Sequence, residues 1–115
     1  MKYMLLIYGN EASFEAASKA DSDRILAAYG AYVEALTKAG VVTDKNRLQR
    51  STAATTVRVA NGATRVLNGP YAETKEQLGG YVVIDVPDHD AALAWAARCP
   101  GASHGAVEVR PVWTM

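Results

Sequence analysis

The chain has 115 residues and a mass of 12.3 kDa, the size of one domain, because domains cluster at roughly 100 to 150 residues. Hydrophobic residues make up 50% of the chain and charged residues 21%, which excludes a disordered or fibrous polymer. Twelve basic residues balance twelve acidic ones, and this neutrality argues against nucleic acid or a polybasic membrane surface as a partner. We expect a single domain over residues 1–115.

The cysteine count and the lengths of the apolar runs indicate where in the cell the protein is located. Cys99 is the single cysteine and cannot form an internal disulfide. The chain opens without a charged leader and a long apolar run, and no stretch approaches the roughly 18 to 20 apolar residues of a membrane helix. These features predict a cytoplasmic protein with no membrane contact.

The first half of the chain predicts a strand and then a helix. Residues 3–8 are apolar at odd and even positions alike, and the run ends at Gly9-Asn10, a turn signal. We therefore expect a central strand that is covered on both faces. From residue 21 the apolar side chains follow a helical period, and Gly40 ends the helix. Its apolar positions are Ile25, Leu26, Tyr29, Tyr32, Val33 and Leu36.

The middle of the chain predicts a β-hairpin. Asn61-Gly62 suits the two positive φ angles of a type I′ turn between two strands rich in valine and threonine. A two-residue loop pairs Val57 with Val66 on one side and Arg58 with Arg65 on the other. The arginines then extend into water, meet acidic residues or hold an anion.

The last third predicts two strands around a helix. Residues 78–86 are rich in the β-branched residues valine and isoleucine, which predicts a buried strand. A helix follows from Pro87-Asp88 to Arg98, and residues 106–113 alternate as the last strand. The buried stripe of this helix is predicted to be Ala92, Leu93, Ala96 and Cys99.

This order of elements predicts an α+β domain of ferredoxin-like type, with two helices on one face of an antiparallel sheet. The other sheet face would carry apolar side chains of the central strands, which disfavours exposure to water. We therefore expect a homodimer in which two sheets pack face to face. The side chains in question are Met4, Leu6, Tyr81, Val83 and Ile84.

Sequence motifs of several common enzyme and binding functions are absent from the chain. GxGxxG, GxxxxGK[ST] and HExxH are absent, and His89 and His104 lack metal-ligand spacing with other His or Cys residues. The sequence predicts no metal site and no cofactor. Cys99 lies on the apolar stripe of a helix, which favours a structural thiol over a nucleophile.

Two polar segments are candidates for function. His104 lies in a polar segment before the last strand, where an imidazole can titrate near neutrality. Residues 68–76 hold a Gly-Pro turn, a phenol, two carboxylates and an ammonium ahead of a buried strand, which suits a pocket rim. Both segments also allow a purely structural reading, as a loop histidine and a solvated turn.

The second segment carries a resemblance to a known family. It reads NGPYAETKEQLGG from Asn68 to Gly80, and it resembles the DGPF-motif branch of the YCII-related proteins, whose loop reads approximately DGPF-x-ETKEQLGG. Asn68 stands where that branch has Asp, and Tyr71 stands where it has Phe, so a mechanism that needs an acid at residue 68 is in doubt. The resemblance extends over nearly the whole chain, including His104 to Trp113.

The resemblance implies a dimeric α/β barrel and a sigma-factor-linked signalling or stress context. Some members of the wider group resemble enzymes with a His and Asp dyad in a cleft, but residues 22–39 here contain no histidine to match the helix-borne one.

Three hypotheses for function result. The first is a dimer that binds a small anionic or aromatic ligand at the sheet rim. The second is a lyase-, isomerase- or monooxygenase-like enzyme without a cofactor, in which His104 is the acid or base. The third is a protein-interaction module for a sigma factor. The predicted ligand-binding side chains are Tyr71, Glu73, Lys75 and Arg110, beside His104.

Overall fold

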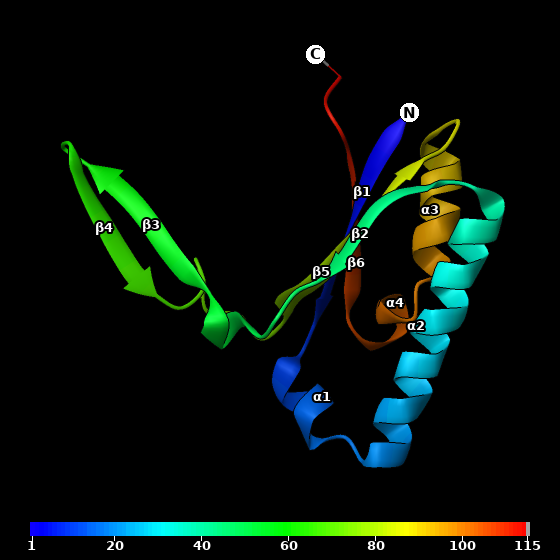
Figure 1. Ribbon diagram of the computed structural model, residues 1–115, viewed down its shortest axis with the longest axis horizontal. Coiled ribbons are helices and arrows are strands. Elements are labelled where there is room, and N and C mark those ends of the chain that lie inside the picture. The colour runs from blue at the N-terminus through cyan, green and yellow to red at the C-terminus, as the bar shows by residue number, and fades with distance from the viewer. Residues whose placement is uncertain (115) are drawn as a thin grey trace.

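The computed structural model describes residues 1–114 and contains a four-stranded sheet, a separate hairpin and helices on one side of the sheet (Figure 1). The elements in chain order are β1 (Lys2–Gly9), α1 (Glu11–Ala16), α2 (Lys19–Ala39), β2 (Val42–Arg47), the 3-10 turn η1 (Ser51–Ala53), β3 (Thr55–Ala60), β4 (Ala63–Asn68), β5 (Gln77–Asp85), α3 (His89–Arg98), α4 (Gly101–His104) and β6 (Ala106–Pro111).

The sheet has the strand order β2-β5-β1-β6, and every neighbouring pair is antiparallel. The α+β class and the central positions of β1 and β5 are confirmed. The predicted order of the strands and long helices is wrong in one respect, because it omits β2 and lets the hairpin strands follow the first long helix directly. With β2 included, the order is that of a split βαβ unit, in which each long helix connects two strands across the sheet.

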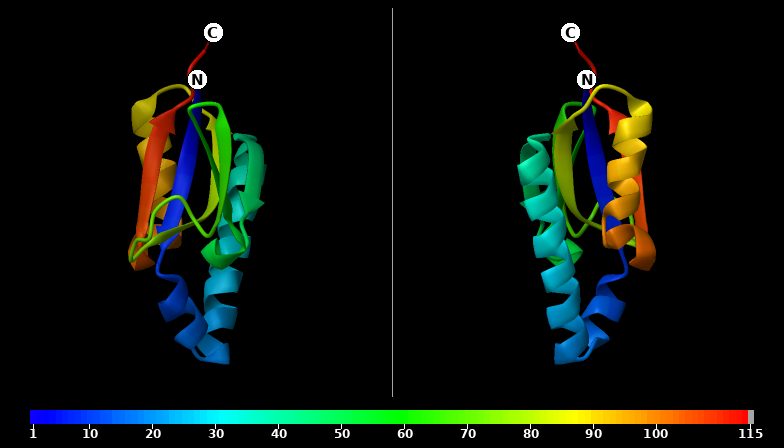
Figure 2. Two further views of the ribbon diagram at one scale, coloured as in Figure 1. Left: turned by 90° about the vertical axis from the view of Figure 1, so that its left-hand side faces the viewer. Right: turned by 90° about the vertical axis from the view of Figure 1, so that its right-hand side faces the viewer.

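Helices α2 and α3 cover one face of the sheet, as the two side views show (Figure 2). The core lies between these helices and the sheet, and its fully buried side chains come from the helices, the central strands and the segments that follow β5 and α3. Tyr32 of α2 donates a hydrogen bond to the carbonyl of Trp95 in α3 at 2.8 Å, which ties the two helices together. The buried hydrophobic residues are Tyr3, Leu5, Tyr32, Leu36, Val82, Ile84, Val86, Ala92, Ala96 and Cys99.

The opposite face, which we call the open face, has no helix over it (Figure 2). Its apolar centre is half-buried and consists of Met4, Leu6, Tyr81 and Val83. Ile84 was expected on this face, and that expectation is wrong: Ile84 pairs with Tyr3 and is fully buried under the helices. Polar side chains flank the centre, and the cross-strand register places on this face Asp44, Asn46, Glu108 and Arg110.

The predicted hairpin is confirmed in its turn and its register. Val57 pairs with Val66 and Arg58 with Arg65, and Asn61 and its neighbouring glycine have φ angles of 52° and 76°. The hairpin does not join the main sheet. It is a two-stranded sheet of its own that extends away from the open-face side (Figure 1).

The two adjacent glycines of β5 have different local roles. The register between β1 and β5 shifts after Ile7, so that Gly79 is the extra residue of a β-bulge. Gly80 is buried against β2, and a Cβ there would lie 2.8 Å from the carbonyl oxygen of Asn46. Only glycine lets the edge strand approach so closely at this point.

The helices differ from expectation at their ends. α2 begins at Lys19, because the Ser18 side chain caps it by accepting a hydrogen bond from Asp21 N at 3.1 Å. Its end at Gly40, with φ of 70°, is as predicted. On α3 the buried stripe follows every third or fourth residue, so Leu93 is 44% exposed, not buried as expected.

Two short helices were not predicted. α1 follows the Gly9-Asn10 turn, where the Asn10 side chain accepts a hydrogen bond from Ser13 N at 3.0 Å and caps the helix. α4 occupies the segment expected to be a loop before the last strand. Among residues 1–114, no helix is long and apolar enough to cross a membrane.

Candidate functional site

His104 is the last residue of α4, and two glycines fix its place. A Cβ on Gly101 would lie 2.5 Å from the Tyr29 hydroxyl oxygen and 2.7 Å from Ile7 Cγ2. A Cβ on Gly105 would collide with the Tyr8 carbonyl oxygen. These two positions admit no larger side chain without a shift, so α4 lies close against β1 and α2 and carries the imidazole to the start of α2.

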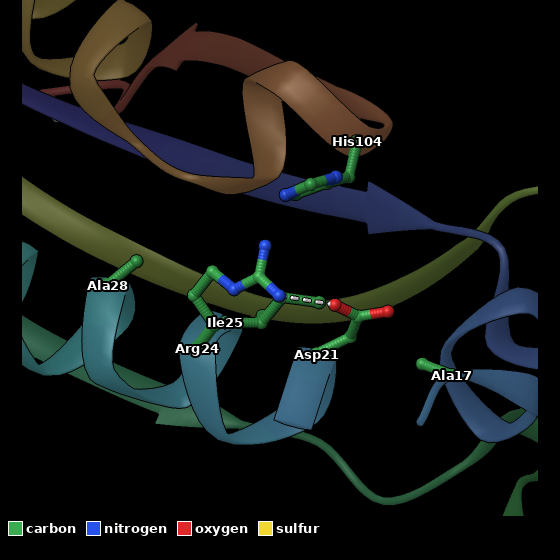
Figure 3. Close-up of a pocket in the computed structure, with 6 residues that line it drawn as sticks. All are labelled: Ala17, Asp21, Arg24, Ile25, Ala28 and His104. Atoms are coloured by element: carbon green, nitrogen blue, oxygen red, sulfur yellow. Dashed lines mark hydrogen bonds and ion pairs between the residues drawn. The ribbon is translucent and has the colours of Figure 1, made fainter. Parts of the chain in front are cut away.

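A groove with a volume of about 380 Å³ opens at this junction, and we call it the His104 groove. α4 supplies the histidine, α2 supplies four lining residues and the link between α1 and α2 supplies the sixth. Figure 3 shows the His104 ring extending from α4 over the groove, toward the Arg24 guanidinium and the Asp21 carboxylate. The lining residues are Ala17, Asp21, Arg24, Ile25, Ala28 and His104.

The charged pair of the groove is local to α2. Arg24 donates from Nη2 to Asp21 Oδ1 at 2.7 Å, one helical turn apart, and both side chains are exposed. An exposed pair of this kind contributes little to stability, about 0.3 to 0.5 kcal/mol. Both residues of the pair line the same groove as His104, and Figure 3 draws the guanidinium on the side of α2 that faces the imidazole.

A second groove, of about 270 Å³, lies at the base of the hairpin, and we call it the hairpin-base groove. Side-chain hydrogen bonds fix its walls: Gln77 Nε2 donates to the Thr74 carbonyl at 2.6 Å, and Ser51 donates to Glu11 from both N and Oγ at 2.7 Å. The lining residues are Ser51, Thr52, Pro70, Ala72, Glu73, Thr74 and Gln77.

The predicted site residues are distributed over the molecule. His104 lines the first groove and Glu73 the second. Tyr71 is 77% exposed and packs under Arg58, whose guanidinium carbon lies 5.1 Å from the ring centroid. Lys75 is exposed in the same loop as Glu73.

Arg110 lies far from His104. It forms an ion pair with Glu108 on the open face, six residues beyond His104 along an extended segment, or roughly 20 Å at the usual strand rise. The loop that carries Glu73 comes nearer, because Glu76 Oε2 lies against Gly105, 3.0 Å from where a Cβ would be. The structure therefore brings the loop's end, but not Arg110, to the segment that holds His104.

The sequence indicated residue 21 only as the start of a helical pattern, and Arg24 was not selected as a site residue. Their i, i+3 spacing at the start of α2 is visible in the sequence. Their relevance depends on α4 lying opposite, which the two glycines around His104 determine.

Next to the His104 groove, the half-buried Tyr29 and the buried Cys99 both have raised pKa values, which favours their protonated forms at neutral pH. Burial, together with the adjacent Cys99, raises the pKa of Tyr29 to about 12. Burial likewise raises the pKa of the Cys99 thiol, which is 1% exposed. Cys99 is therefore placed as a structural thiol. Within residues 1–114, no group of three or more His, Cys, Asp or Glu side chains is arranged to hold a metal ion.

Comparison with known proteins gives the family. The model of the YCII-related domain matches residues 1–115, and the chain belongs to this family. An uncharacterized protein of Rhizobium meliloti (strain 1021) is 40% identical over 114 residues, which cover 97% of this chain and 92% of that protein.

A solved structure shares the fold. It is 5-chloro-2-hydroxyhydroquinone dehydrochlorinase from Burkholderia phenoliruptrix, in complex with 2,5-dihydroxybenzoquinone. The TM-score is 0.56 at 14% identity, and the match covers 99% of this chain and 94% of that one. At this identity the likeness extends to the fold alone.

Proposed function

We propose that this protein binds a small anionic or aromatic molecule in the His104 groove. The observation that carries the proposal is the combination of an arginine–aspartate ion pair, one imidazole and an apolar wall in a groove of about 380 Å³. Ligand sites are concave and mostly apolar, with a few polar groups that fix the ligand's orientation.

Within the groove, Arg24 is the side chain suited to an anionic group of the ligand. A guanidinium carries five N–H donors in a planar fork that matches a carboxylate or a phosphate. The ion pair with Asp21 engages Arg24 through Nη2, and the remaining donors suit a bound anion. Ile25 and Ala28 form the apolar side of the groove, which suits an aromatic ring.

A thermal-shift series tests this proposal. The probes are benzoate, 2,5-dihydroxybenzoquinone and inorganic phosphate, because a ligand that binds the folded state raises its stability by mass action. Arg24→Gln and His104→Ala should remove or reduce the shift. Lys38→Gln is the matched control, since Lys38 is an exposed cation of the same helix with its own i, i+4 ion pair to Glu34.

The outcomes separate the two grooves. A shift retained in Arg24→Gln and His104→Ala but lost in Glu73→Gln or Lys75→Ala would overturn the proposal in favour of the hairpin-base groove. A shift lost equally in Lys38→Gln would also contradict the proposal. That result would mean that the probe is attracted by the positive charge of the helix and does not bind in the groove. No shift with any probe would remove its support.

The second candidate function is catalysis in the same groove, with His104 as general acid or base. The specific observation is that an imidazole and a carboxylate, from His104 and Asp21, line one groove. The dehydrochlorinase that shares the fold acts on a chlorinated hydroxyhydroquinone, so that compound is a suitable probe. Chloride release that needs His104 would support catalysis, and ligand binding without turnover would restrict the function to binding.

We further propose that the open face packs against the open face of a second copy, as the apolar Met4, Leu6 and Val83 suggest. A sigma-factor contact stays a separate proposal that uses Arg58 and Arg65 of the hairpin. Variants in the His104 groove should leave either interaction unchanged.

A further inference from the structure

We propose that the hairpin-base groove is a second binding site, which takes a small organic amine in its charged ammonium form. Among its lining residues the one charged side chain is the carboxylate of Glu73, and none is a lysine, arginine or histidine. A ligand with a positive charge is therefore the one that this groove favours. The inference goes beyond the function proposed above, because the two grooves share no lining residue.

Two hydroxyl groups of the groove are already engaged as donors, which leaves their oxygens free to accept. Ser51 Oγ donates to Glu11 at 2.7 Å, and Thr74 Oγ1 donates to the carbonyl of Glu76. Each of these oxygens then has only lone pairs for a ligand. The exposed carboxylate of Glu73 adds about four further acceptor positions. These acceptors match a ligand that is rich in N–H donors.

Few side-chain donors remain in the lining. Gln77 Nε2 uses one N–H for the Thr74 carbonyl at 2.6 Å and keeps the other, and Thr52 has its hydroxyl. An ammonium group has N–H donors and no acceptor, so it satisfies the acceptors directly. A carboxylate or phosphate would instead place its oxygens against lone pairs and against the charge of Glu73.

Glu11 connects the two walls of the groove. Its backbone N donates to Gln77 Oε1 at 3.0 Å, and its carboxylate accepts two hydrogen bonds from Ser51, both at 2.7 Å. Acceptors that are held in place before binding lose less conformational freedom when a ligand arrives. The Glu11 carboxylate also adds negative charge behind the wall that Ser51 forms.

The size and composition of the groove restrict the class of cation. Its volume of about 270 Å³ lies below the roughly 300 to 1,000 Å³ of typical ligand sites, and Pro70 and Ala72 offer apolar surface to a short hydrocarbon chain or a single ring. A calcium ion is disfavoured, because it takes about six to eight oxygen ligands and Glu73 is the one carboxylate of the lining.

The cations near the groove leave this preference intact. Arg50 precedes Ser51 in the chain, but its charge is paired with Glu15. Lys75 lies two residues after Glu73, is exposed and does not belong to the lining, so solvent and salt screen its repulsion of a bound amine. Replacing Lys75 by glutamine should leave amine binding unchanged or make it tighter, whereas binding of an anion in this loop would become weaker.

An amide NMR titration tests the site. The probe is 2-phenylethylammonium chloride, and 2-phenylethanol is the neutral compound of the same shape. The amine should shift the signals of residues 51–52 and 72–77 to saturation, and the alcohol should not. The dissociation constant should rise at least about fivefold in Glu73→Gln, which loses the charged acceptor. It should rise less than about twofold in Glu76→Gln, which removes an equal charge from the same loop but outside the lining.

The other outcomes would overturn the proposal. Equal shifts with the amine and the alcohol would mean that charge has no role, and equal effects of Glu73→Gln and Glu76→Gln would mean that the amine is attracted to the loop in general. Weaker binding in Lys75→Gln, shifts confined to other residues, or no saturable shift would also contradict it. Arg24→Gln should leave the amine titration unchanged, so failure of the His104 groove is distinguishable.

Discussion

Glu11 accepts two hydrogen bonds from Ser51, one from the backbone N and one from Oγ, both at 2.7 Å. The contact joins the start of α1 to the turn at the foot of the hairpin, 40 residues further along the chain. Hydrogen bonds to a charged acceptor contribute about 1.5 to 3 kcal/mol. Glu11→Ala should therefore lower the free energy of unfolding by about that amount in urea titrations.

The control for this variant is Glu15→Ala. Glu15 lies on the same helix and pairs with Arg50 at the surface, where both side chains are about half exposed. Exposed ion pairs contribute about 0 to 1 kcal/mol. Equal losses in the two variants would show that the Glu11 contact has no particular weight.

Gly80→Ala should destabilise the sheet, whereas Gly79→Ala should not. A Cβ at residue 80 would lie 2.8 Å from the Asn46 carbonyl oxygen, but at residue 79 the nearest atom is the Ile7 carbonyl oxygen at 3.8 Å. Overpacking of this kind costs about 1 to 3 kcal/mol. Thermal unfolding of the two variants measures the difference, and equal stability would contradict the close approach of β2 to β5.

Stability should fall between about pH 10 and 12. Burial raises the pKa of Tyr29 from 10.0 to about 12, so in this window the unfolded chain has lost a proton that the folded chain retains. Unfolding then releases a proton, and its free energy decreases as pH rises. Urea titrations from pH 7 to 12 should show a flatter alkaline decline in Tyr29→Phe. An unchanged slope would mean that Tyr29 titrates as it does in the unfolded chain.

Cys99 should be inert in the folded protein. It is 1% exposed, and burial raises the pKa of its thiol, so little thiolate is present and reagents cannot reach it. An aromatic disulfide reagent should label the native chain at least on the order of 10³-fold more slowly than the denatured chain, because labelling waits for opening. Rapid labelling of the native chain would contradict the burial of this side chain.

The sequence predicted those elements whose signals are local. The Asn61-Gly62 turn determines the hairpin register without help from the rest of the chain. The apolar runs of β1 and β5 correctly indicated central strands. β2 was missed, because it is an edge strand with the sequence VTDKNR, is mostly exposed and has no apolar alternation. This segment becomes a strand because it pairs with β5, a contact that the local sequence does not indicate.

The candidate site could be predicted only in part. His104 was selected for its chemistry and for the polar segment around it. Its opposite side chains, Asp21 and Arg24, depend on how α4 packs against α2, which is a tertiary relation. Arg110 was grouped with His104 as part of a polar rim beside the apolar sheet, yet six residues of mostly extended chain separate the two.

An NMR titration of the two histidines tests the central claim most directly. His104 lines the groove, whereas His89 begins α3 and stacks on Tyr3 with ring centroids 5.9 Å apart, so His89 serves as an internal control. On addition of benzoate or 2,5-dihydroxybenzoquinone, the imidazole signals of His104 should shift to saturation while those of His89 stay in place. The shift should be lost in Arg24→Gln and kept in Lys38→Gln. Saturable binding of either probe with both histidine spectra unchanged would contradict the His104 groove as the site.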